Sequence, residues 1–192
     1  LSLHDALPIS LIEDNIQLPK IIMAFHSPAR FAPGDAELDI LANILDDGKT
    51  SRLYKALVFD AELAQSVSAH QSSQDLSSVF EISAIARPNV SLDAIEKAID
   101  KILTELLANG VTQAEVERAK NDYETGFVTQ LQSVPSRAAT LNTYQTFLDD
   151  PGFIGKDLER YRKVDVASVN AQIKATIDLS GRVVLRVEPK TP

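Results

Sequence analysis

The chain has 192 residues, of which 44% are hydrophobic and 24% are charged, and its formal net charge is −8. This composition is ordinary for a globular protein and excludes a mainly disordered, collagen-like or low-complexity chain. The length corresponds to one domain or slightly more, which is enough to bury a substantial core.

The charge balance argues against a nucleic-acid partner, because a phosphate-binding surface needs clustered Lys and Arg. The densest basic stretch holds Arg160, Arg162 and Lys163, and acidic residues flank it on both sides. We interpret it as a solvated helix end. No apolar run reaches the roughly 18 residues of a membrane-spanning helix, so we expect no membrane span. The absence of Cys excludes disulfides, thiolate zinc sites and a Cys nucleophile.

Residues 1–10 read LSLHDALPIS, with no initiator Met and no signal-peptide pattern. The segment resembles translated adapter sequence, so we expect residues 1–9 to be non-native or truncated, and His4 then leaves any site. The alternative is a genuine strand cut by an arbitrary boundary. Residues 10–192 are predicted to form a single domain of a fragment whose N-terminal side is missing.

The first half of the chain alternates between strand and helix patterns. Residues 20–26 form a short apolar run, which predicts a strand covered on both faces, and the prolines that follow predict a loop. Apolar spacing predicts a helix from Asp35 that ends at Gly48, and Ser51 is a suitable N-cap for a second, shorter helix. Residues 65–70 and 79–84 alternate apolar with polar side chains, which predicts a hairpin.

The second half is predicted to be mainly helical. Ser91 caps the clearest helix, which closes at Gly110, and Thr112 opens the next with capping-box spacing to Glu115. A further helix follows Pro135, Asp165 caps the last one, and residues 182–188 form a closing strand. The predicted fold is therefore α+β with two layers: a mixed, mostly antiparallel β-sheet covered on one face by helices.

The histidines do not form a zinc motif. A zinc site typically needs three or four His, Cys, Asp or Glu ligands, often two of them a helical turn apart. The chain has only His4, His26 and His70, and neither H-x-x-E-H nor H-E-x-x-H is present. We interpret His26 and His70 as satisfied or solvated imidazoles, although they could approach each other in space. We assign no metal ligand and no catalytic residue to this chain.

Other catalytic patterns are also weak. The sequence has no G-x-S-x-G elbow, and the sequence around Gly48-Lys49-Thr50 has Asn43 where a phosphate loop needs Gly. Glu115, Glu117 and Glu124 share a helix with basic residues, which favours a solvated face stabilised by charge pairs. A paired-carboxylate acid/base site remains the alternative interpretation of these three residues.

The order of several segments carries a family resemblance over about residues 11–190. These segments are LPKIIMAFHSP, DAELDILANILDDGKTSRLYKALV, LAQSVSA, GVTQAEVERAKNDYETGF, SRAATLNTYQ and VVLRVEP. Together they resemble the non-catalytic, C-terminal closing domain of the pitrilysin/insulinase family of zinc metallopeptidases. The resemblance implies one half of a clam shell. Its partner is a homologous catalytic domain, in the same chain or a separate subunit, that binds Zn²⁺ through H-x-x-E-H and a downstream Glu.

The resemblance also implies what this half contributes. It closes the chamber of a metalloendopeptidase and helps dock the peptide substrate at a sheet edge, so we expect the isolated chain to be inactive and to bind no zinc. The family often has an Arg and a Tyr that reach toward the peptide, and the matching substrate-binding positions here are Val58 and Gln65. Val58 has no hydrogen-bond donor, whereas the Gln65 amide still has one.

Two functions therefore remain open at this point. One is the closing half of a zinc endopeptidase, and the other is a structural or assembly subunit of the same fold without proteolytic activity, which the altered Val58 and Gln65 positions favour. The resemblance also points to the periplasm or cell envelope of a Gram-negative bacterium.

Overall fold

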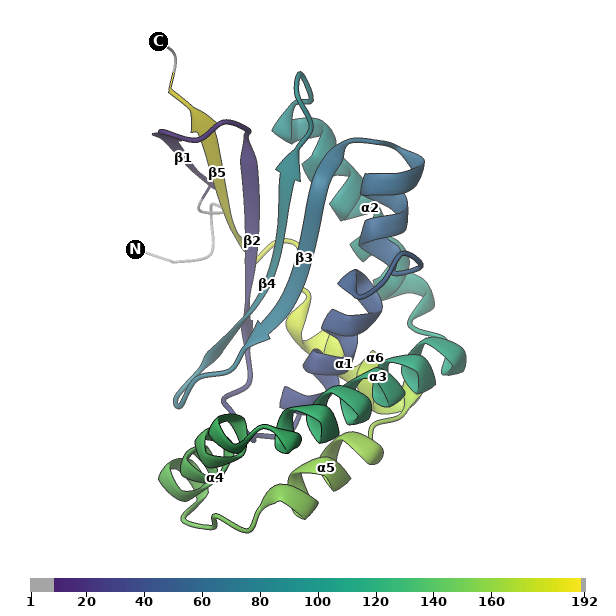
Figure 1. Cartoon of the computed structure of the whole chain (residues 1–192). Coiled ribbons are helices and arrows are strands. Elements are labelled where there is room, and N and C mark those ends of the chain that lie inside the picture. Colours follow the sequence, from purple (N-terminus) through teal and green to yellow (C-terminus); the bar gives the residue numbers. More distant parts are fainter. Residues whose placement is uncertain (1–8, 191–192) are drawn as a thin grey trace, which may run out of the picture.

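Strand β2 (Lys20–Ser27) lies at the centre of the sheet, and its side chains alternate between two environments. Ile21, Met23 and Phe25 are buried, whereas the side chains between them are more exposed. Because successive side chains of a strand point to opposite faces, one face of the sheet forms the core. The prediction that both faces of this strand are covered is wrong: in the computed structural model, which describes residues 9–190, the helices lie on one face (Figure 1).

The sheet is mixed and mostly antiparallel, as predicted. Its strand order is β1-β5-β2-β4-β3, in which β1 and β5 run parallel and the other neighbours run antiparallel. This order makes β3 an edge strand. The remaining strands are β1 (Ile9–Asp14), β3 (Ala64–Ser72), β4 (Ser78–Ala86) and β5 (Val183–Pro189).

Strand β1 is missing from the predicted order of elements, although it begins within the segment whose alternative interpretation was a genuine strand. It pairs with the closing strand β5, with Ile9 opposite Val184 and Asp14 opposite Pro189. Local sequence does not indicate this strand because its partner lies at the other end of the chain. The expected non-native segment falls almost entirely outside the described residues, as does His4, whereas Ile9 begins β1.

The helices pack against the buried face of the sheet around α1. This helix buries Leu38, Leu41 and Leu45 completely and contacts β3, α3, α5 and α6. No helix within residues 9–190 is long and apolar enough to cross a membrane. The helical elements are α1 (Asp35–Asp46), η1 (Tyr54–Asp60), α2 (Leu92–Asn109), α3 (Gln113–Gln132), α4 (Val134–Leu148), α5 (Ile154–Arg162) and α6 (Val166–Thr176).

Three of the four predicted N-caps are confirmed. Ser51 is the exception: its buried hydroxyl has no hydrogen-bond partner among the described residues, and η1 begins after Leu53. The Ser91 side chain accepts a hydrogen bond from the backbone N–H of Ala94, and Thr112 and Glu115 form a complete capping box at the start of α3. Asp165 forms a second capping box with Ser168 at the start of α6. Each cap satisfies backbone donors that the first helical turn leaves free, so these helix starts are encoded locally.

Two helical segments differ from the prediction. The segment expected as a short helix after Ser51 is a π-helix, η1, over most of its length. Helix α5 was not among the predicted elements, and its Arg160 is not solvated: the side chain is 21% exposed and forms ion pairs with Asp35 and Asp157. The prediction of a solvated helix end is therefore wrong for Arg160, whereas Arg162 and Lys163 are exposed at the C-terminus of α5.

Candidate functional site

The histidines do not come together in the fold. His26 lies on β2 and His70 on β3, with β4 between these strands. His26 is exposed, and its Nδ1 lies 3.0 Å from Oγ of Ser77. Within residues 9–190 no group of three or more His, Cys, Asp or Glu side chains is placed to hold a metal ion. The residues that the structure describes therefore do not fit a zinc centre.

The three glutamates of α3 each face a cation rather than one another. Glu115 receives hydrogen bonds from Nε and Nη2 of Arg52 at 2.7 and 2.8 Å, and the guanidinium lowers the pKa of Glu115 to about 2. Glu117 lies 3.9 Å from Lys120, and Glu124 pairs with Arg162. This arrangement favours charge pairing over the alternative of a paired-carboxylate acid/base site.

Val58 and Gln65, the two positions matched to the family pair, lie on adjacent elements. Val58 is part of η1, and its partly buried side chain packs against the core. Gln65 is exposed near the start of β3, where the register with β4 shifts between Ala64 and Ser66. A side chain that packs into the core is unavailable to a peptide, whereas an exposed amide at a sheet edge is available.

Arg87 fixes the two segments that carry these positions. Its Nη2 donates to the backbone oxygen of Val58 at 3.1 Å, and its Nε donates to the backbone oxygen of Ala64 at 3.3 Å. Nη1 also lies 3.4 Å from Glu62, which adopts a left-handed backbone conformation with φ 51°. One guanidinium therefore holds the end of η1 against the start of β3.

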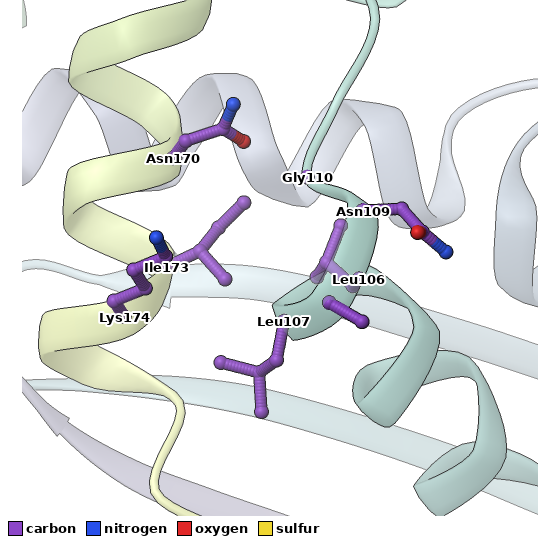
Figure 2. A pocket seen from close by; sticks show the side chains of 8 residues that line it. Leu106, Leu107, Asn109, Gly110, Asn170, Ile173 and Lys174 are labelled. Carbon is purple, nitrogen blue, oxygen red and sulfur yellow. The ribbon is translucent and has the colours of Figure 1, made fainter.

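A small cavity of about 120 Å³ lies between the C-terminus of α2 and helix α6 (Figure 2). Leu106 and Ile173 face each other across it, and Asn170 points toward Gly110. The Asn170 Oδ1 accepts a hydrogen bond of 2.9 Å from the backbone N–H of Val111. We interpret this cavity as part of the contact between α2 and α6, in which Asn170 fixes the backbone just before α3.

A larger cleft, of about 290 Å³, opens between helices α3, α4 and α5 and the loop before α1. We call it the α3–α5 cleft. Aromatic rings form much of its wall: Tyr161 stacks on Tyr123 with ring centroids 3.5 Å apart, and Tyr144 lies at 6.0 Å from Phe31. Its principal side chains are Asp35, Asp39, Tyr123, Tyr144, Asp157 and Tyr161.

Two carboxylates of the cleft are well compensated. Arg160 donates to Asp157 at 2.7 Å and to Asp35 at 3.1 Å. The hydroxyl of Tyr144 donates to Asp157 at 2.8 Å, and Ser73 donates to Asp35 at 2.6 Å. Asp35 and Asp157 are buried, so these partners replace the water that each carboxylate loses on folding.

Asp39 is different. Its Oδ2 accepts one hydrogen bond of 2.6 Å from the hydroxyl of Tyr161, and no Lys, Arg or His within residues 9–190 forms an ion pair with it. Loss of solvent around this carboxyl raises its pKa to about 7, although the Tyr161 hydrogen bond acts in the opposite direction. Asp39 is therefore the one of the three cleft carboxylates that forms no ion pair within residues 9–190, although the more distant charge of Arg160 lowers its pKa somewhat.

Sequence reasoning missed this cleft because its members come from four separate segments. One signal was present: Asp35 and Asp39 are spaced four residues apart and so share a face of α1 with its apolar stripe. Acidic side chains beside buried apolar ones need partners, which here come from α5.

Comparison with known proteins identifies the fold and the family. Residues 4–123 match the family model described as the peptidase M16 inactive domain. The chain is 30% identical over 132 residues to the zinc protease PqqE of Helicobacter pylori, a match that covers 69% of this chain and 30% of that protein. The chain thus spans less than a third of the length of this curated relative.

Solved structures share the fold. A protease from Helicobacter pylori superposes with a TM-score of 0.86 at 22% identity, covering 97% of this chain and 45% of that one. The periplasmic protease PqqL from Escherichia coli gives a TM-score of 0.73 at 17% identity, covering 96% and 21%. Together with the family match, these findings confirm the resemblance to the pitrilysin/insulinase peptidases: the chain belongs to the family of peptidase M16 inactive domains.

Proposed function

We propose that this chain is the closing half of a zinc-dependent endopeptidase, in which it covers the reaction chamber and helps dock the peptide substrate. Hydrolysis is the task of a homologous catalytic domain with H-x-x-E-H, in the same chain or in a partner subunit, and that domain holds the zinc. The family match of residues 4–123 to a peptidase inactive domain carries this proposal. The lack of an assembled ligand set within residues 9–190 supports it.

Peptide docking is proposed at the free edge of β3. This strand pairs with β4 along one side and has no strand on its other side within residues 9–190. An extended peptide adds to such an edge through backbone hydrogen bonds, which need no special side chain. The amide of Gln65, which is exposed near the start of β3, supports this proposal because it is available to a peptide at the edge.

The test is reconstitution with the catalytic half. This chain is titrated into a purified M16 domain that carries H-x-x-E-H, and cleavage of a quenched fluorescent peptide is followed with and without EDTA. We expect no cleavage by this chain alone, cleavage by the mixture, and loss of that cleavage in EDTA. Chelator-sensitive cleavage by this chain alone, or a mixture no faster than the catalytic half, contradicts the proposal.

The observation at Val58 favours a second candidate, an assembly subunit of the same fold without proteolytic activity. Its core-packed side chain has no donor for a peptide carbonyl. Under this alternative the chain binds its homologous partner with the same stoichiometry but the complex cleaves no peptide. The reconstitution separates the two candidates when complex formation is measured by size-exclusion chromatography of the same mixture: a complex without cleavage supports the assembly subunit.

The compartment follows from relatives and is proposed on that basis. One relative of the same fold is described as a periplasmic protease. We propose the periplasm or cell envelope of a Gram-negative bacterium for the parent protein. Fractionation of the native host, followed by immunoblotting with an antibody to this domain, tests the location directly.

A further inference from the structure

We propose that the α3–α5 cleft binds a basic side chain of the peptide, Lys or Arg, with Asp39 as its counter-ion. This inference rests on the proposed peptide-docking function and names the class of side chain that the docked peptide carries. The cleft lies between α3, α4, α5 and the loop before α1, and Ser73, the residue after β3, is part of its lining, so it is a side-chain site that adjoins the C-terminal end of β3.

The charges of the cleft carry the first part of the argument. Asp35, Asp39 and Asp157 line it, with Arg30 as the single basic residue in the lining. Arg160, which lies beside the cleft, is shared between Asp35 and Asp157. Asp39 has the neutral hydroxyl of Tyr161 as its hydrogen-bond partner. Arg160 acts on Asp39 only from beyond ion-pair distance, so a cation that enters the cleft supplies the direct ion pair that Asp39 lacks within residues 9–190.

The aromatic walls carry the second part, because the faces of such rings attract cations. The protein's own guanidinium groups already use rings in this region in this way. Arg160 lies 5.2 Å from the centroid of Phe31, and Arg30 lies 5.0 Å from that of Phe147. The stacked rings of Tyr123 and Tyr161 line the cleft as well. A cationic side chain thus meets both a carboxylate and aromatic rings.

The size of the cleft limits what fits. Its volume of about 290 Å³ lies at the lower end of the range of roughly 300–1,000 Å³ that is typical of small-molecule sites. This space suits one long side chain and not a folded partner. The peptide side chain must also keep clear of Arg30, whose guanidinium donates to the backbone oxygen of Ser73 and lies over the ring of Phe147.

A purely structural role explains Asp39 less well. A carboxylate that loses water without gaining a cation destabilises the folded state, and an Asn of the same shape would accept the Tyr161 hydrogen bond without that cost. Residues that reduce stability are typical of sites where function requires them. Asp35 and Asp157, by contrast, are satisfied within the fold.

The experiment measures the affinity of the purified 192-residue chain for peptides. Fluorescein-labelled extended peptides that differ at one central position, Lys, Arg, norleucine or Glu, are titrated with the protein, and fluorescence anisotropy gives each dissociation constant. We expect Lys and Arg peptides to bind about tenfold more tightly than norleucine, and Glu more weakly still. Asp39→Asn is expected to abolish this preference. Asp14→Asn makes the same charge change on β1, outside the cleft, and should preserve it.

A second variant keeps the test valid if Asp39→Asn does not fold. Ala139 is exposed and lines the cleft, so Ala139→Lys places an ammonium group at its mouth and should weaken binding of the Lys peptide. Equal affinity for Lys and norleucine peptides, or an unchanged preference in both variants, overturns the cleft proposal and leaves edge docking intact. If no peptide binds, the proposed docking function fails together with the cleft proposal.

Discussion

The hydroxyl of Tyr161 donates a hydrogen bond of 2.6 Å to Oδ2 of Asp39, which joins residues 122 positions apart in the sequence. The contact connects α5 to the central helix α1, and the ring of Tyr161 stacks on Tyr123 of α3. Three helices therefore meet at one polar pair beside the α3–α5 cleft. Among the described residues no cation forms an ion pair with Asp39, and burial raises its pKa, so its protonation state links pH to the stability of this junction.

Asp39→Asn should change how stability depends on pH. Burial raises the pKa of Asp39 to about 7, so between the usual Asp range and pH 7 the folded state binds more protons than the unfolded state. The free energy of unfolding therefore falls as pH rises through this window. Between pH 5 and pH 8, we expect the free energy of unfolding of Asp39→Asn to fall by about 1–3 kcal/mol less than that of the unmodified chain.

Urea titrations at a series of pH values measure this difference between the two proteins. Asp14→Asn is the control, since it removes a carboxylate outside the cleft and should leave the profile parallel to that of the unmodified chain. Identical pH profiles for Asp39→Asn and the unmodified chain would show that Asp39 titrates normally.

Gly110→Ala should destabilise the folded chain where the C-terminus of α2 contacts α6. Gly110 has φ +69°, and a Cβ there would lie 2.4 Å from Oδ1 of Asn170, which holds the backbone of Val111. We expect a loss of about 1–3 kcal/mol in the free energy of unfolding. Gly126→Ala is a matched control: it lies within α3 with nothing within 4 Å, so it should stabilise the chain by about 0.5–1 kcal/mol. Equal effects of the two substitutions would contradict this account.

Arg87→Ala should loosen the connection between η1 and β3. It removes the hydrogen bonds to the backbone oxygens of Val58 and Ala64, and the expected loss in the free energy of unfolding is about 1–3 kcal/mol. Hydrogen exchange should increase locally at the start of β3. Arg137→Ala, an exposed side chain on α4, is expected to change stability by less than about 0.5 kcal/mol. Unchanged exchange at β3 would exclude the bridging role.

Gln65→Ala tests the contribution of the β3 edge within the reconstituted enzyme. Because Gln65 is exposed, its removal should leave the free energy of unfolding within about 0.5 kcal/mol. Loss of a hydrogen bond to the peptide should lower kcat/KM for peptide cleavage by about 2- to 10-fold. Ser66→Ala, an adjacent exposed side chain, is the control and should have little effect. Equal kcat/KM for Gln65→Ala and the unmodified chain would remove Gln65 from the docking site.

Local sequence patterns predicted the elements that are stabilised by interactions between residues close in the sequence. The caps at Ser91, Thr112 and Asp165 were located correctly because a cap and the turn that it satisfies are only three residues apart. The hairpin of β3 and β4 was predicted from alternation around one polar turn. The order of moderately specific segments was enough to indicate the family, which the comparisons confirm.

Long-range pairing accounts for what those patterns did not indicate. Strand β1 exists through its pairing with β5 near the other end of the chain, and Arg160 is enclosed because Asp35, 125 positions away, accepts its hydrogen bond. The sequence by itself determined the α+β class, the capped starts of α2, α3 and α6, and the family. Only the tertiary structure brought Asp39, Tyr123 and Tyr161 to one cleft, because burial and charge pairing depend on neighbours distant in sequence.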